Sequence, residues 1–404
     1  MITNNYRIKN IISKVVDNRG RNTDYFDFEK YPIIDNYMIK NEIHPELETA
    51  TRFLSEDQYH TFLRGYIDSD DLLMTLVGNG IGNVTLSPHS KCAIVQNTIG
   101  LAFDKSICDQ VYIYYYFKTI QPTIRNLDRG SSQPSVNRED IFRLRVQLPN
   151  ITIQNKIVSI LSAYDHLIEV NNKRIKVLEQ MAENLYKEWF VRFRFPGHET
   201  AKFENGIPRG WKYTRFEEIC SYDRGVSYST EEIECDEGEN LINLKNIQGF
   251  GGFRRDGTKK YNGQYKTEQI VHYKDLIMGV TDMTQDRRTV GAVALIPSMH
   301  GVISADLIKL NSKIESVFLY CLFRWGFYST YISQFGNGAN VIHLKPSAIK
   351  NTKILIPKSD LIKAFVKFVD PLIDQIDTFY ANIDNLITQR DLLLPRLMSG
   401  KLEV

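Results

Sequence analysis

Apolar residues recur every seven positions in two long stretches of this sequence, and each stretch carries a second apolar row on the same face. A sustained stripe of this kind is typical of long amphipathic helices. The stripe positions are Tyr164, Ile168, Ile175, Leu178 and Leu185 in the first stretch and Leu372, Ile376, Phe379, Ile383 and Leu386 in the second. Asn171 interrupts the first stripe, either as a solvated gap or as a polar residue that sets helix register.

Capping signals give expected ends for the two helices. Asp370-Pro371 reads as an N-cap followed by proline at the first helical position, so a short helix is expected to end there and a long one to begin. Ser162 is the equivalent residue in the first stretch, which predicts a helix from about Ser162 to near Trp189, roughly 40 Å long. The second helix is expected to end before Pro395.

The two stretches belong to an internal repeat. Gly130–Pro149 and Gly338–Pro357 share a glycine, a polar turn, an amphipathic step and a strand that ends in proline. The two final prolines are 208 residues apart (357 − 149), as are Arg145 and Lys353. A strand-like, turn-rich segment precedes each block. The predicted organisation has strand-rich domains at 1–130 and 197–338, and helical regions at 131–196 and 339–404.

Composition sets broad bounds on the class of protein. The chain has 404 residues, enough for two or more domains, and a formal net charge of +2. Binding to nucleic acid would therefore depend on local clusters of basic residues. The five cysteines are scattered, which favours buried thiols over a disulfide framework or a structural zinc site. No window approaches the roughly 18 apolar residues of a membrane span, and the N-terminus lacks a secretory pattern, so a cytoplasmic location is expected.

The sequence contains no signature of catalysis. A phosphate-loop motif, an H-E-x-x-H motif, an Asn-Pro-Pro-aromatic tetrapeptide and a [DE]-x-K triplet are all missing, and the eight histidines lack metal-ligand spacing. The run "VGNGIG", with Gly78, Gly80 and Gly82, raises a nucleotide-binding loop as an alternative. Only Gly82 has a counterpart in the second half, Gly291, and the segments that follow both are strand-like. A hairpin turn is therefore favoured over a phosphate cradle.

Three further stretches carry a family resemblance: "ENLYKEWFVRFRFPGHE", "GIPRGWKYTRFEEIC" and "RDLLLPRLMSGKLEV". With the repeated strand-Pro-helix blocks, they make the chain resemble the specificity subunits (HsdS) of type I restriction-modification enzymes over essentially its whole length. The resemblance implies an α+β fold in which two mixed α/β target-recognition domains are joined by two long helices packed as an antiparallel coiled coil. The apolar stripes would form the seam of that coiled coil, and the fold would have a pseudo-two-fold internal repeat.

The same resemblance implies function and partners. Each recognition domain would read half of a bipartite, asymmetric site in double-stranded DNA, and the helices would dock two methyltransferase subunits. Two restriction subunits would join the assembly. The chain itself is expected to be non-catalytic, prokaryotic and without cofactor or metal; S-adenosylmethionine would bind to the methyltransferase subunit, and ATP and magnesium to the restriction subunit. Two alternatives stay open: a self-contained S-adenosylmethionine- or nucleotide-binding enzyme that uses Gly78–Gly82, and a helical scaffold without sequence preference.

Basic and amide side chains on predicted turns are the candidates for DNA contact, because such groups reach phosphates and base edges. The longer second hairpin, "DMTQDRR", is the main candidate. The candidates in the first domain are Arg19, Arg21, His89 and Lys91; those in the second domain are Arg254, Arg255, Lys259, Lys260, Gln285, Arg287 and Arg288; and His343 and Lys345 lie just before the second repeated strand.

Overall fold

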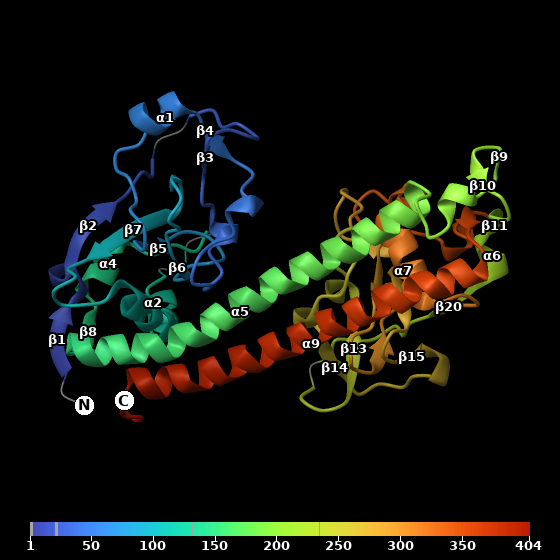
Figure 1. Ribbon diagram of the computed structural model, residues 1–404. Helices are drawn as coiled ribbons and strands as arrows, with labels where there is room; N and C mark the ends of the chain where they lie inside the picture. Colours follow the sequence, from blue (N-terminus) through green and yellow to red (C-terminus); the bar gives the residue numbers. More distant parts are fainter. Residues whose placement is uncertain (1–2, 21–22, 129, 131–132, 234) are drawn as a thin grey trace. The chain divides into compact units, whose positions relative to one another are not determined.

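The computed structural model describes residues 3–20, 23–128, 130, 133–233 and 235–404, so the candidate Arg21 lies outside the described residues. The chain divides into two compact units (Figure 1). Unit 1 contains Met1–Asn171 together with Asn382–Val404, and unit 2 contains Asn172–Ala381. These units differ from the four sequence segments, because each long helix contributes one part to each unit.

Unit 1 is built on a four-stranded antiparallel sheet of order β2-β7-β5-β6. The strands of this sheet are β2 (Ile12–Val16), β7 (Thr98–Phe103), β5 (Leu72–Thr75) and β6 (Val84–Leu86). Two smaller antiparallel pairs are β1 (Thr3–Arg7) with β8 (Arg145–Pro149) and β3 (Tyr31–Pro32) with β4 (Phe53–Leu54). The shorter helices are α1 (Glu56–Thr61), α2 (Gln110–Thr119), α3 (Gln121–Arg125) and α4 (Arg138–Arg143).

Unit 2 repeats this frame and adds to it. Its first sheet has the order β12-β20-β16-β18, formed by β12 (Cys220–Arg224), β20 (Leu307–Ser312), β16 (Leu276–Gly279) and β18 (Val293–Leu295). A second, mixed sheet consists of β14 (Lys259–Tyr261), β13 (Glu239–Ile242), β19 (Gly301–Ile303) and β15 (Ile270–Val271). The small pairs are β9 (Phe203–Glu204) with β10 (Ile207–Pro208), β11 (Lys212–Arg215) with β22 (Lys353–Ile356), and β17 (Thr281–Asp282) with β21 (Ile342–His343). The shorter helices are α6 (Phe216–Ile219), α7 (Ser316–Trp325) and α8 (Tyr328–Ser333).

The internal repeat predicted from the sequence is confirmed strand by strand. In β1·β8 Arg7 lies opposite Arg145, and in β11·β22 Arg215 lies opposite Lys353. Both members of the second pair are offset by 208 residues from those of the first, so the register itself is duplicated. The isolated bridge between Val77 and Ser135 likewise corresponds to the β17·β21 pair of unit 2.

The ends of the long helices differ from the expectation. The helix α5 covers Ile151–Tyr186 without a break at Ser162, and a π-turn at Lys187–Val191 follows it, so the expected end near Trp189 is close to correct. The helix α9 covers Ser359–Met398 and passes through both Pro371 and Pro395. The two predicted helix starts and the predicted end before Pro395 are therefore wrong.

Local contacts explain why the capping signals misled. The side chain of Asn150 accepts a hydrogen bond from the N–H of Ile153 at 3.0 Å, so the N-cap of α5 lies directly after β8. Proline inside a helix removes one backbone hydrogen bond. Packing on both sides of Pro371 offsets this loss, because Phe365 and Val369 are fully buried in the unit 2 core and Leu372 packs against it.

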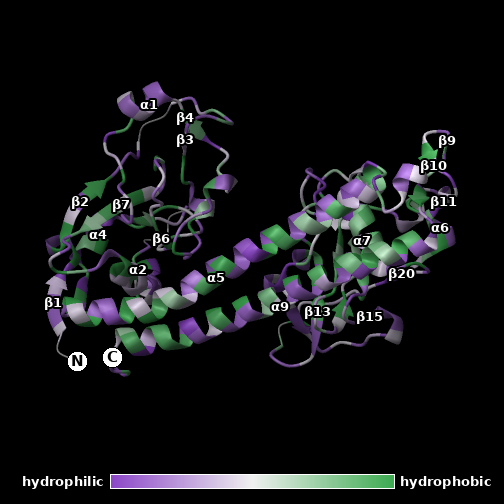
Figure 2. Cartoon of the chain, in the orientation of Figure 1, coloured by the Kyte–Doolittle hydropathy of each residue, from purple (hydrophilic) through white to green (hydrophobic). Residues whose placement is uncertain are grey.

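The long helices run antiparallel and carry part of each unit's core. In unit 2 Arg174 lies 5.4 Å over the ring of Phe379, while Trp189 lies 5.7 Å from Phe365, so residue numbers rise along one helix as they fall along the other. In unit 1 the early part of α5 and the end of α9 enter one core through Ile157, Leu161, Leu394 and Leu397. Hydrophobic and hydrophilic residues alternate along both helices (Figure 2). Among the helices of the described residues, none is long and apolar enough to cross a membrane.

The predicted seam positions lie along this helix pair. Ile175 and Ile383 are buried, and the other eight stripe residues are half-buried. Leu185 and Leu372 pack against the core of unit 2, so part of the stripe covers the recognition domain as well. Asn171 is buried, which excludes the interpretation as a solvated gap.

Candidate nucleic-acid interface

The segment Met283–Arg288 forms an exposed loop in unit 2, and the β17·β21 pair places it beside the chain that leads into β22. Thr281 lies opposite His343 in that pair. The Nε2 of Gln285 donates to the carbonyl of Ala339 at 2.6 Å, and an Arg287 guanidinium nitrogen donates to the carbonyl of Gln334 at 3.4 Å. The candidate segments "DMTQDRR" and "GANVIHLKPS" therefore meet on one surface.

A buried carboxylate fixes both ends of this loop. Asp282 accepts hydrogen bonds from the backbone N–H and hydroxyl of Thr284 and from the same two groups of Thr289, each at 2.8 Å. Burial alone would raise the pKa of the Asp282 carboxyl, but these four hydrogen bonds hold its pKa below the usual value. The side chain therefore remains ionised near neutral pH and keeps the loop in one conformation.

Apolar side chains stand exposed beside the basic ones on this loop. Met283 is 67% exposed and Phe250 is 61% exposed, and the N–H of Phe250 donates to the carbonyl of Arg288 at 2.8 Å. A mixture of basic, amide and unburied apolar side chains suits contact with DNA, where charges hold phosphates and apolar groups meet bases. Sequence reasoning missed Phe250, Met283 and the anchoring role of Asp282.

His343 and Lys345 lie on the same surface. Both are exposed, whereas Ile342 and Leu344 are buried, so successive side chains point alternately outward and into the core. Their contact with DNA stays a prediction, and the geometry permits it.

The basic residues between Arg254 and Lys260 lie before and at the start of β14 in unit 2. Arg255 forms an ion pair with Asp377 of α9 and lies 6.0 Å over the ring of Tyr380. In the structure the guanidinium joins the recognition domain to the helix, and its contact with DNA stays a prediction. Arg254 forms an ion pair with Asp256 at 2.7 Å. Lys259 and Lys260 are exposed, with Lys260 donating to the Asn240 side chain at 3.2 Å.

In unit 1 the candidates lie in two places. Arg19 is bound to Asp17 through two nitrogens, at 2.8 and 2.7 Å, and the pKa of the Asp17 carboxyl is lowered mainly by this hydrogen bonding. Arg138 reaches the same carboxylate at 2.9 Å. His89 and Lys91 are exposed after β6 and line a shared surface pocket with Tyr59 and Tyr66, among other residues.

The glycine run of unit 1 is a hairpin, as predicted. Leu72, Leu73 and Met74 pair with Leu86, Thr85 and Val84, and a strand follows the glycines. Gly82 and its counterpart Gly291 both have φ of +75°, and both backbones lie against a short helix, α3 or α8. A helix N-terminus pointing at an anion is the feature that a phosphate loop needs, and here β6 occupies that position. Gly78–Gly82 therefore lack the helix N-terminus that a phosphate-binding loop needs.

Polar side chains that the sequence did not single out converge on this hairpin. The Nε2 of Gln121 donates to the Asn83 side-chain oxygen at 2.6 Å, and Arg125 donates to the same oxygen at 3.3 Å. Arg125 is exposed and so presents a charge next to the turn. Only the internal repeat could have pointed to Gln121 and Arg125, because the turn in unit 2 that corresponds to this hairpin also packs against a short helix, α8.

Buried or partly buried ion pairs join the helices to both recognition domains. In unit 1 Asp165 of α5 pairs with Arg390 of α9 and accepts a hydrogen bond from the Tyr115 hydroxyl of α2. In unit 2 Arg324 of α7 pairs with Glu179 of α5 at 3.1 Å and also bonds the Tyr320 hydroxyl. Burial would lower the pKa of Arg324, but these partners raise it, so the guanidinium stays charged.

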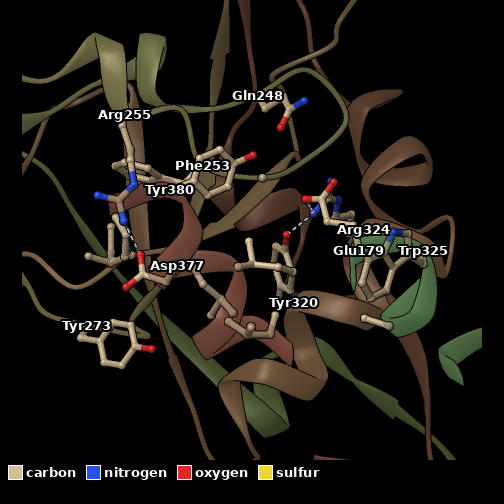
Figure 3. A pocket seen from close by; sticks show the side chains of 17 residues that line it. Glu179, Gln248, Phe253, Arg255, Tyr273, Tyr320, Arg324, Trp325, Asp377 and Tyr380 are labelled. Carbon is tan, nitrogen blue, oxygen red and sulfur yellow. Dashed lines mark hydrogen bonds and ion pairs between the residues drawn. The ribbon is translucent and has the colours of Figure 1, made fainter. Parts of the chain in front are cut away.

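A pocket separates the two charged contacts of unit 2 (Figure 3). Arg255 and Asp377 pair on one side of it, and Arg324 and Glu179 pair on the other. Apolar residues such as Ile376 line the space between them. These two partly buried ion pairs join the recognition domain to α5 and α9.

A duplicated α/β domain, carried on long helices and presenting polar and basic loops beside the strand that enters each helix, defines a recognition protein with two reading domains. The family described as "Type I restriction modification DNA specificity domain" has a model that matches residues 7–180 and 208–389, and the chain belongs to this family. Each match contains one recognition domain and most of its long helix.

Relatives and a solved structure agree with this assignment. The chain is 27% identical over 302 residues to the type I restriction enzyme MjaIX specificity subunit of Methanocaldococcus jannaschii, covering 72% of this chain and 69% of the relative. It is 22% identical over 350 residues to the MjaVIII specificity subunit of the same organism, covering 84% and 80%. The fold is similar to the crystal structure of the type I restriction-modification S subunit from M. genitalium, with a TM-score of 0.60 at 13% identity, covering 98% and 96% of the two chains.

Proposed function

We propose that this chain is the DNA-specificity subunit of a type I restriction-modification complex and that its two units read the two parts of an asymmetric, bipartite site in double-stranded DNA. One observation carries the proposal. The frames of the two units agree in register at β1·β8 and β11·β22, whereas the loops between β5 and β6 and between β16 and β18 differ in length and polarity. Equal frames with different loops suit the reading of two different base sequences.

The catalytic groups would belong to partner subunits. Two observations support this proposal: the sequence lacks the motifs of methyl transfer and of nuclease chemistry, and a strand, not a helix, follows the glycines of the β5–β6 hairpin. We propose that two methyltransferase subunits, which bind S-adenosylmethionine, dock on α5 and α9, and that two restriction subunits with ATP and magnesium complete the assembly. Exposed residues on α5 and α9, such as Val177 and Phe368, are open to such partners.

The test assembles the full chain with its methyltransferase subunits and sequences the methylated positions in random DNA. A two-part motif is expected. Replacing Arg287 and Arg288 with alanine should weaken or relax one part of the motif and leave the other unchanged. Arg209 and Arg215, also in unit 2 and paired with glutamates, provide a control for the loss of two positive charges.

Two results would exclude the proposal. Methylation or cleavage of DNA by the purified chain alone would support the enzyme alternative, which calorimetry with S-adenosylmethionine tests directly. Methylation at an unchanged motif, after the 283–288 loop and the β5–β6 hairpin are both exchanged for those of a related chain, would favour a scaffold.

Binding of the assembled complex to DNA is expected to fall steeply as the salt concentration rises, because binding releases cations from the phosphates.

A further inference from the structure

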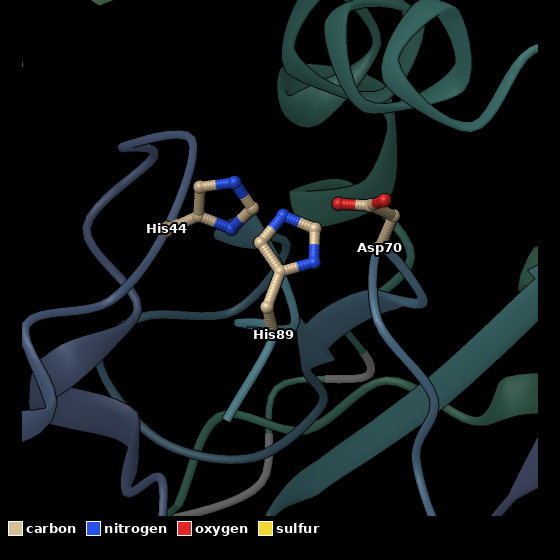
Figure 4. A group of neighbouring side chains, drawn as sticks. All are labelled: His44, Asp70 and His89. Carbon is tan, nitrogen blue, oxygen red and sulfur yellow. The ribbon is translucent and has the colours of Figure 1, made fainter. Parts of the chain in front are cut away.

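Three potential metal ligands of unit 1 meet at one end of the β5–β6 hairpin. His44 lies in the segment beside β6, Asp70 lies before β5, and His89 follows β6 (Figure 4). One ligand atom from each lies within 4.8 Å of the others. The three residues are far apart in the sequence, so no spacing pattern indicated them.

The backbone fixes all three positions before any ion binds. The N–H of Leu86 donates to the carbonyl of Ile43 at 2.8 Å, which places His44 against the end of β6. The N–H of Asp70 donates to the carbonyl of Ser87 at 3.1 Å, two residues before His89. Strand pairing and these two bonds therefore hold the ligands on one ordered scaffold, as a metal site requires.

The hydrogen bonding of His44 also favours metal binding. Its Nδ1 lies 3.3 Å from the carbonyl oxygen of Leu86, and because a carbonyl only accepts, Nδ1 carries the proton in this contact. The lone pair of Nε2 is then free for a ligand. A ligating histidine that donates its other N–H to a backbone carbonyl is the usual arrangement around zinc.

The second copy uses the same backbone position for a different purpose. Asp70 has φ of +66°, and its counterpart Lys274 has φ of +63°, with an N–H that donates to the carbonyl of Ile296 at 2.9 Å. The Lys274 ammonium pairs with Asp370 and Asp374 of α9, both at 2.6 Å. The shared left-handed turn thus holds a cation in unit 2 and a carboxylate between two histidines in unit 1.

We propose that His44, Asp70 and His89 bind one divalent transition-metal ion of the zinc class. Two imidazoles and one carboxylate suit zinc, and a surface position leaves a fourth site for water. Calcium and magnesium prefer oxygen ligands and would bind poorly. The ion would tie the 40–46 segment to the base of the hairpin. His89 then serves as a ligand, in place of the DNA contact expected from the sequence.

The experiment uses the purified full chain, freed of metal with a chelator, and needs no DNA, so its result is independent of the proposed function. Titration with Co²⁺ or Zn²⁺ alone is expected to show one saturable site per chain. The cobalt spectrum should lack the charge-transfer band of a thiolate, because no cysteine belongs to the site. A thiolate band would assign the ion to a cysteine and overturn the proposal.

The variants His44→Ala, Asp70→Asn and His89→Ala should each weaken Zn²⁺ binding by more than about tenfold. Even the loss of a residue that only supports a metal ligand typically weakens binding by about that factor. Asparagine tolerates positive φ, so Asp70→Asn preserves the turn while it removes the charge. His60→Ala is the matched control, because His60 lines the neighbouring pocket but pairs with Glu56. Unchanged affinity in the three ligand variants, or equal loss in His60→Ala, would refute the site.

Discussion

Arg390 of α9 and Asp165 of α5 form an ion pair whose side chains are only 11% and 6% exposed. Asp165 also accepts a hydrogen bond from the Tyr115 hydroxyl, so one carboxylate joins α5, α9 and α2 of the recognition domain. A buried pair of this kind stabilises poorly against an apolar alternative, but the loss of one partner leaves an uncompensated charge. The ion pair therefore acts mainly by fixing which residues of α5 and α9 lie opposite one another.

Replacing Arg390 with glutamine should lower the free energy of unfolding of unit 1 by about 3–5 kcal/mol, because the Asp165 carboxylate would remain buried without its cation. Hydrogen exchange of α2 and β8 would measure the loss. Arg396→Gln removes an exposed charge from the same helix and should change exchange little. Equal protection in the two variants would contradict the role of the pair.

Replacing Gly291 with alanine should destabilise unit 2 by more than about 1 kcal/mol, through the left-handed backbone and through crowding. An added Cβ would lie 2.9 Å from the Ser329 carbonyl oxygen. The chain's three tryptophans, Trp189, Trp211 and Trp325, all lie in unit 2, so their fluorescence reports its unfolding. Gly206 has a similar φ of +80°, but an added Cβ would meet no atom within 4 Å. Gly206→Ala therefore measures the cost of the left-handed backbone without crowding. Equal midpoints for the two variants would show that crowding by α8 adds nothing.

The sequence predicted the long helices because their apolar residues recur at a regular spacing. It predicted the repeat and the hairpins because the two halves of the chain can be compared with each other. It failed at Pro371 and Pro395, where long-range packing outweighs a local breaking signal. The sequence also could not reveal the ion pair between Arg255 and Asp377, because a basic residue on a turn gives no sign of which carboxylate will fold against it. The cluster around Asp70 was hidden because only strand pairing brings its members together.

Replacing Asp282 with alanine should weaken binding to one part of the DNA motif by about tenfold, or about 1.4 kcal/mol. The loop of Gln285 and Arg288 would lose four hydrogen bonds that fix its ends. Titration of the assembled complex with DNA altered in one half-site at a time measures the effect. Asp286→Ala removes an exposed carboxylate from the same loop and should not weaken binding, because phosphates repel that charge. Weakening by both variants alike would argue against a positioning role for Asp282.

Lys118 gives unit 1 a distinctive dependence on pH. Burial, together with repulsion from Arg390, lowers the pKa of Lys118 to about 8 from its usual value of 10.5. Between these two values the unfolded chain binds more protons than the folded one, so this residue makes stability rise with pH across that window. Urea unfolding followed by circular dichroism should show a smaller rise for Lys118→Met than for the natural chain. Parallel curves for the two proteins would refute the assignment.

Unit 2 is one uninterrupted stretch of chain inserted between the two parts of unit 1. The core that includes Leu394 and Leu397 closes only after residues 382–404 have been synthesised, although the first recognition domain is made first. During translation the second recognition domain is therefore complete before the first. An early stop in the gene would thus expose the apolar interior of the domain encoded farthest from the stop.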